Sequence, residues 1–207
     1  MPQKVISGKT ETSLEILKKA DILKDFYLAG GTGLALQLNH RLSIDLDFFS
    51  LKEINIKNLI QKIKKLGRLS VEKESEGTLI CRFNGTRLTF LKYEYPLLFN
   101  LKTIKGIKVA SIQDIGCMKI SAVSSRGTKK DFIDLYFICQ KIVSFKKILE
   151  LFKKKYKSVN YNMLHILKSL SYFMDAEKDP IPKMINQISW QEVKNFFKKE
   201  IMDNGIK

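Results

Sequence analysis

The chain has 207 residues, of which 44% are hydrophobic, so a packed core is expected and global disorder is not. Its formal net charge is +16, from 37 Lys and Arg against 21 Asp and Glu. This excess favours a polyanionic partner, although a lysine-rich solvated surface explains it equally well. Two His and three widely spaced Cys exclude a zinc site and a disulfide scaffold, and no apolar run reaches membrane-spanning length. A soluble, cytoplasmic protein with buried free thiols is expected.

The first part of the chain alternates short helical and strand-like patterns. Apolar spacing predicts, in chain order, a helix near 13–24, a strand at 26–29, a helix from Thr32 to Asn39, a strand from Ser43 to Phe49 and a helix over 56–66. Gly67 is placed as the cap of that last helix. Strands follow at about 69–74, 78–83 and 87–93, the last two joined by Asn84-Gly85, the strongest hairpin signal in the chain.

Beyond Pro96 the pattern becomes helical. Helices are expected near 111–125, 128–140, 144–156, 160–174 and 189–202, with a loop over 175–182. Ser111 with Asp114 and Ser189 with Glu192 resemble capping boxes. The lysine-rich stretches near 146–157 and 194–199 are interpreted as solvated helix faces, or together as an RNA-docking surface. The predicted fold is α+β: an N-terminal α/β domain at 1–110, with a mixed sheet flanked by helices, and a helical domain at 111–207.

The strongest local feature is Gly30-Gly31-Thr32, where a strand runs into a helix. Glycines let a ligand approach the backbone closely, and free N–H groups with the positive end of the helix dipole favour phosphate there. The Thr32 hydroxyl is an additional donor. An ordinary strand–helix turn explains the same residues, so this motif alone does not define a site.

Asp45 and Asp47 strengthen the case for a site. Residues two apart on a strand project from one face, and apolar neighbours indicate that this strand is at least half buried. Two carboxylates there are costly unless they are paired, and Mg²⁺ favours one or two carboxylates plus phosphate oxygens. Salt bridges to Arg41 or to lysines are the alternative.

Three stretches of the chain resemble the motifs of one protein family. The stretch YLAGGTGLALQLNHRLSIDLDFFS resembles the nucleotidyltransferase motif of the AbiEii/AbiGii toxin family, which belongs to the DNA polymerase beta-like nucleotidyltransferase superfamily. Downstream, RLTFLKYEYPLL resembles that family's strand and turn, and SIQDIGCMKISAVSSRGTKKDFIDLYFI resembles its helical block. The three matches occur in the family's order and cover roughly residues 26 to 140, which implies a nucleotidyltransferase-like fold.

The resemblance implies a role for each matching position. Asp45, Asp47, Lys119 and Asp134 are the expected catalytic residues, with Asp45 and Asp47 holding Mg²⁺ and Lys119 on the triphosphate. The expected nucleotide-binding residues are Gly30, Gly31, Thr32, Arg41, Ser43, Arg126, Lys130 and Asp131. His40 matches the same run as Arg41 and Ser43. Without the resemblance, Lys119 would be interpreted as a solvated charge and Asp131 as a partner of the helix dipole.

One position departs from the superfamily's pattern. Members of the superfamily commonly have a third carboxylate on a neighbouring strand. In this chain the corresponding residue is Thr89, which cannot act as a base or a charged metal ligand. Glu94 lies five residues on and points to the opposite side of a regular strand. Asp134 or Asp131 would then help to activate the acceptor, or the site would work with two carboxylates, or activity would be lost.

The predicted function is transfer of a nucleoside monophosphate from an NTP to an acceptor hydroxyl. The resemblance and the net charge make tRNA the first expected acceptor, and the family implies a toxin with an antitoxin encoded nearby. The helical domain would pack against the first domain and complete the site. The alternatives are nucleotidylation of a protein hydroxyl, or binding of nucleotide or RNA without turnover.

Overall fold

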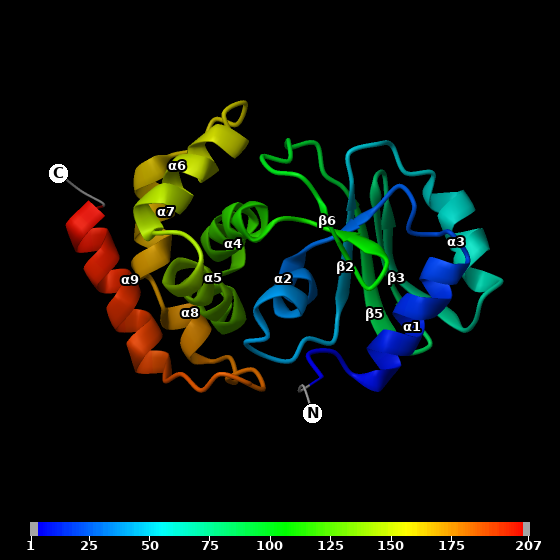
Figure 1. Ribbon diagram of the computed structural model, residues 1–207. Coiled ribbons are helices and arrows are strands. Elements are labelled where there is room, and N and C mark those ends of the chain that lie inside the picture. The colour runs from blue at the N-terminus through cyan, green and yellow to red at the C-terminus, as the bar shows by residue number, and fades with distance from the viewer. Residues whose placement is uncertain (1–3, 205–207) are drawn as a thin grey trace. The chain divides into compact units, whose positions relative to one another are not determined.

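The computed structural model describes residues 4–204 and divides into two compact units (Figure 1). Unit 1 holds the residues up to Pro96 together with Asn100–Ser111. Unit 2 holds Leu97–Phe99 and the residues from Ile112 on. The predicted α+β class is confirmed, because unit 1 carries a seven-stranded mixed sheet and unit 2 is helical.

The sheet of unit 1 has the strand order β3-β4-β5-β2-β1-β7-β6. Its strands are β1 (Tyr27–Leu28), β2 (Leu46–Ser50), β3 (Leu69–Ser75), β4 (Thr78–Phe83), β5 (Thr86–Lys92), β6 (Lys102–Ile104) and β7 (Ile107–Val109). The pairs β2/β5 and β1/β7 are parallel, and the other neighbours are antiparallel. This arrangement places β2, which follows the candidate phosphate turn, in the interior of the sheet.

Helices cover the sheet of unit 1. They are α1 (Gly8–Lys19), α2 (Gly30–Leu38) and α3 (Ile56–Lys64). In Figure 1, α1 and α3 lie on one side of the strands and α2 on the other. The main core forms where α1 and α3 meet the sheet, and it contains fully buried Leu17, Ile63, Phe83 and Phe90. Alternate residues of β2 and β5 face this core, so the residues between them, Asp47 included, face the other way.

Two tight turns of unit 1 contain residues with positive φ. Asn84 (φ 47°) and Gly85 (φ 76°) join β4 to β5, which confirms the predicted hairpin. Lys105 (φ 51°) and Gly106 (φ 75°) join β6 to β7 in the same way. The sequence prediction missed this second hairpin, because its strands have three residues each and its turn lacks the Asn-Gly signal.

Several predicted boundaries in unit 1 are wrong. The first helix begins at Gly8, capped by the Ser7 hydroxyl, rather than near Ser13. Helix α2 begins at Gly30 rather than Thr32, and β2 begins at Leu46 rather than Ser43. The predicted Gly67 cap is also wrong: α3 ends with Lys65 in right-handed conformation as its C-cap.

Unit 2 consists of helices packed around aromatic side chains. They are α4 (Ile112–Arg126), α5 (Lys129–Lys141), α6 (Phe145–Lys155), α7 (Met163–Ser171), α8 (Met174–Glu177) and α9 (Trp190–Asn204). Phe132 packs against Phe173, Trp190 and Phe197, with ring centroids 5.2–5.8 Å apart. Over residues 4–204, no helix combines the length and the apolar character that a membrane crossing requires.

Of the two capping boxes predicted beyond Pro96, the one at Ser189 is formed in the structure. The Ser189 N–H donates to Glu192 Oε2 (2.9 Å) and the Glu192 N–H donates to Ser189 Oγ (3.1 Å), so the second box is confirmed. The Ser111–Asp114 box stays a prediction; the Asp114 carboxylate accepts hydrogen bonds from the Leu98 and Phe99 N–H groups and pairs with Lys155 Nζ at 2.8 Å. Both side chains of this ion pair are fully buried, so interpreting every lysine of 146–157 as solvated is wrong for Lys155.

Candidate active site

The strand–helix junction of unit 1 brings two charged side chains against glycine backbone. Gly30 has φ +61°, and a Cβ added there would lie 2.5 Å from Asp47 Oδ2. A Cβ on Gly31 would lie 2.3 Å from Nη2 of the buried Arg41. Asp47 therefore reaches the start of α2 because Gly30 has positive φ and no side chain, and the end of Arg41 lies where a Cβ on Gly31 would crowd it.

Thr32 fixes the segment that leads into β2. Its buried hydroxyl lies 2.8 Å from Ser43 Oγ and donates to the carbonyl oxygen of Asp45. The Ser43 N–H donates to the Val5 carbonyl oxygen at 2.8 Å. These bonds hold the backbone of Asp45 next to the first turn of α2, and the roles of Thr32 and Ser43 on a phosphate stay predictions.

The two carboxylates occupy different surroundings. Asp47 lies on β2, whereas Asp45 precedes the strand, and both are half buried. Within residues 4–204, no group donates a hydrogen bond to the Asp45 carboxylate or forms an ion pair with it. A half-buried carboxylate without such a partner is suited to bind a cation.

Unit 1 offers Mg²⁺ a small set of oxygen ligands. The described residues contain no group of three or more His, Cys, Asp or Glu side chains arranged to hold a metal. Mg²⁺ usually takes only one or two protein carboxylates and completes its octahedron with water and substrate phosphate oxygens. Asp45, Asp47 and the glycine turn beside them meet that smaller requirement, so these residues fit the ion.

The sheet register identifies the neighbour of Asp47. Asp47 pairs with Thr89 across the parallel β2/β5 ladder, so Thr89 occupies the adjacent position on the same face. Glu94 is exposed and forms an ion pair with Lys92 at 2.6 Å. The residue next to Asp47 is therefore a threonine with a hydroxyl group, and Glu94 pairs with Lys92 instead.

Replacing Gly30 with Ala should disrupt the junction. The new methyl group would lie 2.5 Å from Asp47 Oδ2 and force it to shift, and a non-glycine residue at this φ costs about 1–2 kcal/mol before any displacement. We expect unit 1 to lose about 2 kcal/mol or more of unfolding free energy, measured by urea denaturation. Gly8→Ala is the matched control, because a Cβ there meets nothing within 4 Å. Equal stability of the two variants would contradict the geometry.

Placing a carboxylate at Thr89 should strengthen cation binding. Thr89→Asp adds a negative charge beside Asp47, and cation affinity rises with the number of charged ligands. We expect about tenfold tighter Mn²⁺ binding in calorimetry. Thr103→Asp, at an exposed position of the edge strand β6, is the control and should leave the affinity unchanged. Unchanged affinity in the Thr89→Asp variant would place the ion away from Asp47.

In unit 2, Lys119 lies between two carboxylates. Its Nζ is 2.8 Å from Asp131 Oδ1 and 2.6 Å from Asp134 Oδ2, and all three side chains are buried. Arg126 donates from Nε and Nη2 to the two Asp131 oxygens, at 2.8 and 3.0 Å, although its own side chain is 56% exposed. The network holds two positive and two negative charges, so it is neutral overall.

Asp131 is the centre of this network. Burial alone would raise the pKa of its carboxyl group, but Lys119 and Arg126 more than offset this and hold the pKa well below its ordinary value. Thr128 Oγ1 also donates to Asp131 Oδ2 at 2.5 Å. Asp131 is therefore an ionised anchor that orients Lys119 and Arg126.

The remaining lysine of the predicted set lies outside the network. Lys130 is exposed, whereas its neighbour Lys129 is buried and donates from Nζ to the carbonyl oxygens of Glu177 (3.3 Å) and Asp179 (2.5 Å). The structure thus gathers Lys119, Arg126, Asp131 and Asp134 in unit 2 and leaves Lys130 apart.

Comparison with known proteins agrees with the fold and with the motifs. The chain has a TM-score of 0.56 with ANT(2″)-Ia in complex with adenylyl-2″-tobramycin, at 15% identity, covering 73% of this chain and 98% of that one. It has a TM-score of 0.53 with MenT4, a nucleotidyltransferase toxin of Mycobacterium tuberculosis H37Rv, at 12% identity and 95% and 86% coverage. The fold is therefore that of nucleotidyltransferases.

Sequence comparison narrows the class to a family. The family model described as nucleotidyl transferase AbiEii toxin, Type IV TA system, matches residues 14–99 and 85–204. An uncharacterized protein of Aquifex aeolicus (strain VF5) is 38% identical over 196 residues, which are 92% of this chain and 93% of that protein. The chain belongs to the AbiEii nucleotidyltransferase toxin family, as the sequence motifs predicted.

Proposed function

We propose that this protein transfers a nucleoside monophosphate from an NTP to a hydroxyl group of an RNA, with tRNA as the first candidate. The observation that carries the proposal is the approach of Asp47 to Gly30, with the Asp45 carboxylate, which no group within residues 4–204 pairs with, two residues before Asp47. This arrangement supports a cation-binding pair beside the first turn of α2, where the N–H groups of a helix lack intrahelical acceptors. Phosphoryl transfer depends mainly on such positioning and charge neutralisation.

The reaction is a displacement at the α-phosphorus. The acceptor oxygen forms a bond to phosphorus, the bond to the bridging oxygen of the β-phosphate breaks, pyrophosphate leaves, and the hydroxyl proton passes to a base or to solvent. Mg²⁺ held by Asp45 and Asp47 would supply charge neutralisation on the phosphates and a lower pKa for the attacking hydroxyl. The backbone of Gly31 and Thr32, with Arg41 beside it, orients the phosphates.

The residues of unit 2 have proposed roles as well. Lys119 neutralises phosphate charge, Asp134 assists removal of the acceptor proton, and Asp131 with Arg126 positions Lys119. Because Thr89 replaces the third carboxylate, proton removal by Asp134 is the part of this mechanism most in need of a direct test.

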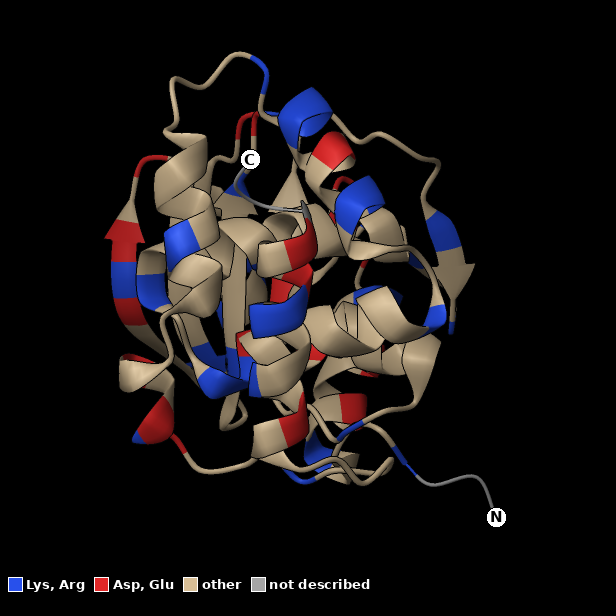
Figure 2. Cartoon of the chain, turned by 90° about the vertical axis from the view of Figure 1, so that its left-hand side faces the viewer, with Lys and Arg blue, Asp and Glu red and all other residues tan. Residues whose placement is uncertain are grey.

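The family supports a toxin with an antitoxin partner, and action in the cytoplasm is part of the same proposal. The net charge of +16 is compatible with an RNA acceptor. Figure 2 shows Lys and Arg segments interspersed with Asp and Glu segments over several elements. The charge therefore favours RNA in general without marking one docking surface.

The test is label transfer. Purified protein is incubated with each α-labelled NTP, Mg²⁺ and total tRNA, and the products are separated into RNA and protein. Label on tRNA supports the proposal. Label on protein would show a protein-nucleotidylating enzyme instead, and NTP binding without any transfer would show a binding protein without turnover.

A further inference from the structure

A row of aromatic rings crosses unit 1 beside the candidate metal site. Tyr27 stacks on Phe49 with centroids 5.9 Å apart, Phe49 meets Tyr93 edge-on at 5.4 Å, and Tyr93 meets Tyr95 at 4.9 Å. Tyr27 and Phe49 are buried, whereas Tyr93 and Tyr95 are only half buried. The row therefore has a packed end and an end whose rings are accessible to a ligand.

The sheet register ties this row to the carboxylates. Phe49 follows Asp47 by two residues on β2, so both side chains lie on the same face. The chain continues beyond β5 to Tyr93, whose N–H donates to the Ser50 carbonyl oxygen at 2.8 Å. With about 3.3 Å of rise per residue, Tyr93 lies roughly 13 Å along the strand from Thr89, the neighbour of Asp47. A nucleotide with its phosphate or sugar hydroxyl near Asp47 can extend its base in this direction.

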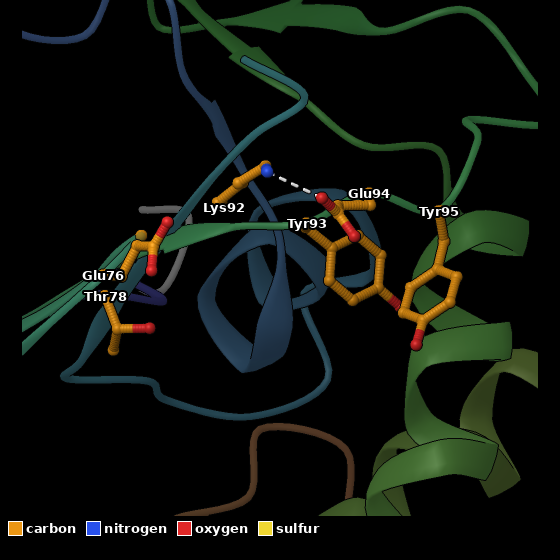
Figure 3. Close-up of a pocket in the computed structure, with 7 residues that line it drawn as sticks. Glu76, Thr78, Lys92, Tyr93, Glu94 and Tyr95 are labelled. Carbon is orange, nitrogen blue, oxygen red and sulfur yellow. Dashed lines mark ion pairs between the residues drawn. The ribbon is translucent and has the colours of Figure 1, made fainter. Parts of the chain in front are cut away.

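The two tyrosines also line a pocket (Figure 3). It has a volume of about 330 Å³, and its other walls come from the turn at Glu76–Gly77, from Thr78 and from the Lys92–Glu94 ion pair. Pockets for small molecules start at about 300 Å³ and combine apolar walls with a few polar groups. The tyrosine rings offer π faces, and Thr78 and Glu94 offer hydrogen-bonding atoms at the edge.

We infer that Tyr93 and Tyr95, whose rings stand at 73° to each other, form an aromatic platform for a nucleobase, on which one ring stacks and the other meets the base edge-on, with Thr78 and Glu94 near its polar edge. Aromatic side chains stack any base, and this stacking is sequence-tolerant because every base has a π face. The inference rests on the proposed function, since it concerns the same site. The base belongs either to the NTP or to the terminal nucleotide of the RNA acceptor, and binding measurements distinguish the two.

The test uses Tyr93→Leu and Tyr95→Leu, with Tyr93→Phe and Tyr95→Phe as matched controls. Leucine keeps an apolar side chain and removes the ring, whereas phenylalanine keeps the ring. Equilibrium dissociation constants are measured separately for an NTP with Mg²⁺ and for a short single-stranded RNA ending in a free 3′ hydroxyl. The loss of one stacking contact is expected to weaken binding by about 5- to 100-fold.

Weaker NTP binding in the Leu variants, with the Phe variants unchanged, assigns the platform to the base of the NTP. Weaker RNA binding in the same pattern assigns it to the acceptor. Unchanged binding of both ligands in folded Leu variants overturns the inference, and so does an equal loss in the Phe variants. Because no turnover is needed, these measurements remain decisive even if the label-transfer test fails, and the ring dependence should persist in an Asp45→Asn background.

Discussion

Replacing Asp45 with Asn is expected to lower the rate of nucleotide transfer by about 10³-fold or more, while the protein keeps its stability. The loss follows from removing a cation ligand, whose charge stabilisation in the transition state amounts to several kcal/mol at about 1.4 kcal/mol per tenfold. Stability is retained because no described group pairs with this carboxylate, so asparagine breaks no contact. The measurements are label transfer to tRNA at saturating NTP and a urea denaturation curve.

Asp25→Asn is the matched control for this experiment. Asp25 is also in unit 1, and its carboxylate forms an exposed ion pair with Lys52 at 2.7 Å. Surface pairs of this kind contribute little to stability, so this variant should transfer label at the wild-type rate. Full activity of the Asp45→Asn variant would remove Asp45 from the metal site. Asp47→Asn should lose activity as well, and the Mn²⁺ affinity of both variants should fall in calorimetry.

Local sequence signals predicted the parts of the fold that depend on a few neighbouring residues. The Asn84-Gly85 turn and the Ser189–Glu192 capping box needed only their own residues to form. Hairpin β6–β7 was missed because its short strands gain their stability from pairing with β1, which no local pattern reveals. Helix α1 was placed too late because its first turn is polar and only its second half carries apolar spacing.

The candidate site also has features that local sequence predicted and features that depend on tertiary structure. Gly30, Gly31 and Asp47 lie in one motif, so the sequence identified their neighbourhood, but the contact of Gly30 with Asp47 follows from a positive φ and a strand pairing. The register of Asp47 with Thr89 agrees with the predicted place of the absent acid. In unit 2, local sequence without the resemblance gives Lys119 as a solvated charge and Lys155 as part of a solvated helix face, and only tertiary packing shows that each is buried against carboxylates. Apolar spacing along a helix therefore could not predict that these charged side chains are buried.

Lys119→Met is expected to destabilise unit 2 by about 3–5 kcal/mol at pH 7, because it leaves two buried carboxylates without their shared ammonium group. Fluorescence of Trp190, the single tryptophan of the chain, reports unfolding of this unit in urea. Lys130→Met is the matched control: that lysine is exposed, and its loss should change stability by less than about 0.5 kcal/mol. Equal stability of the two variants would contradict the buried network.

The direction in which the unfolding free energy changes with pH tests the same network. In the wild-type protein Lys119 and Arg126 lower the pKa of Asp131, so the stabilisation from Asp131 is fully present above about pH 4 and is lost as pH falls through the lowered folded value. In the Lys119→Met variant, burial disfavours the ionised form of the Asp131 carboxyl group, and of the two cations only Arg126 remains to offset this. Protonation of the carboxyl group in acid therefore lowers the cost of burying it. The stability gap between wild type and Lys119→Met should therefore narrow below about pH 4. A stability gap that stays constant from pH 7 to pH 3 would mean that methionine costs stability through packing alone.

The NTP affinity of the folded Lys119→Met variant separates the two roles of Lys119. The affinity should fall if the ammonium group also contacts the triphosphate, and stay constant if this group only pairs with Asp131 and Asp134.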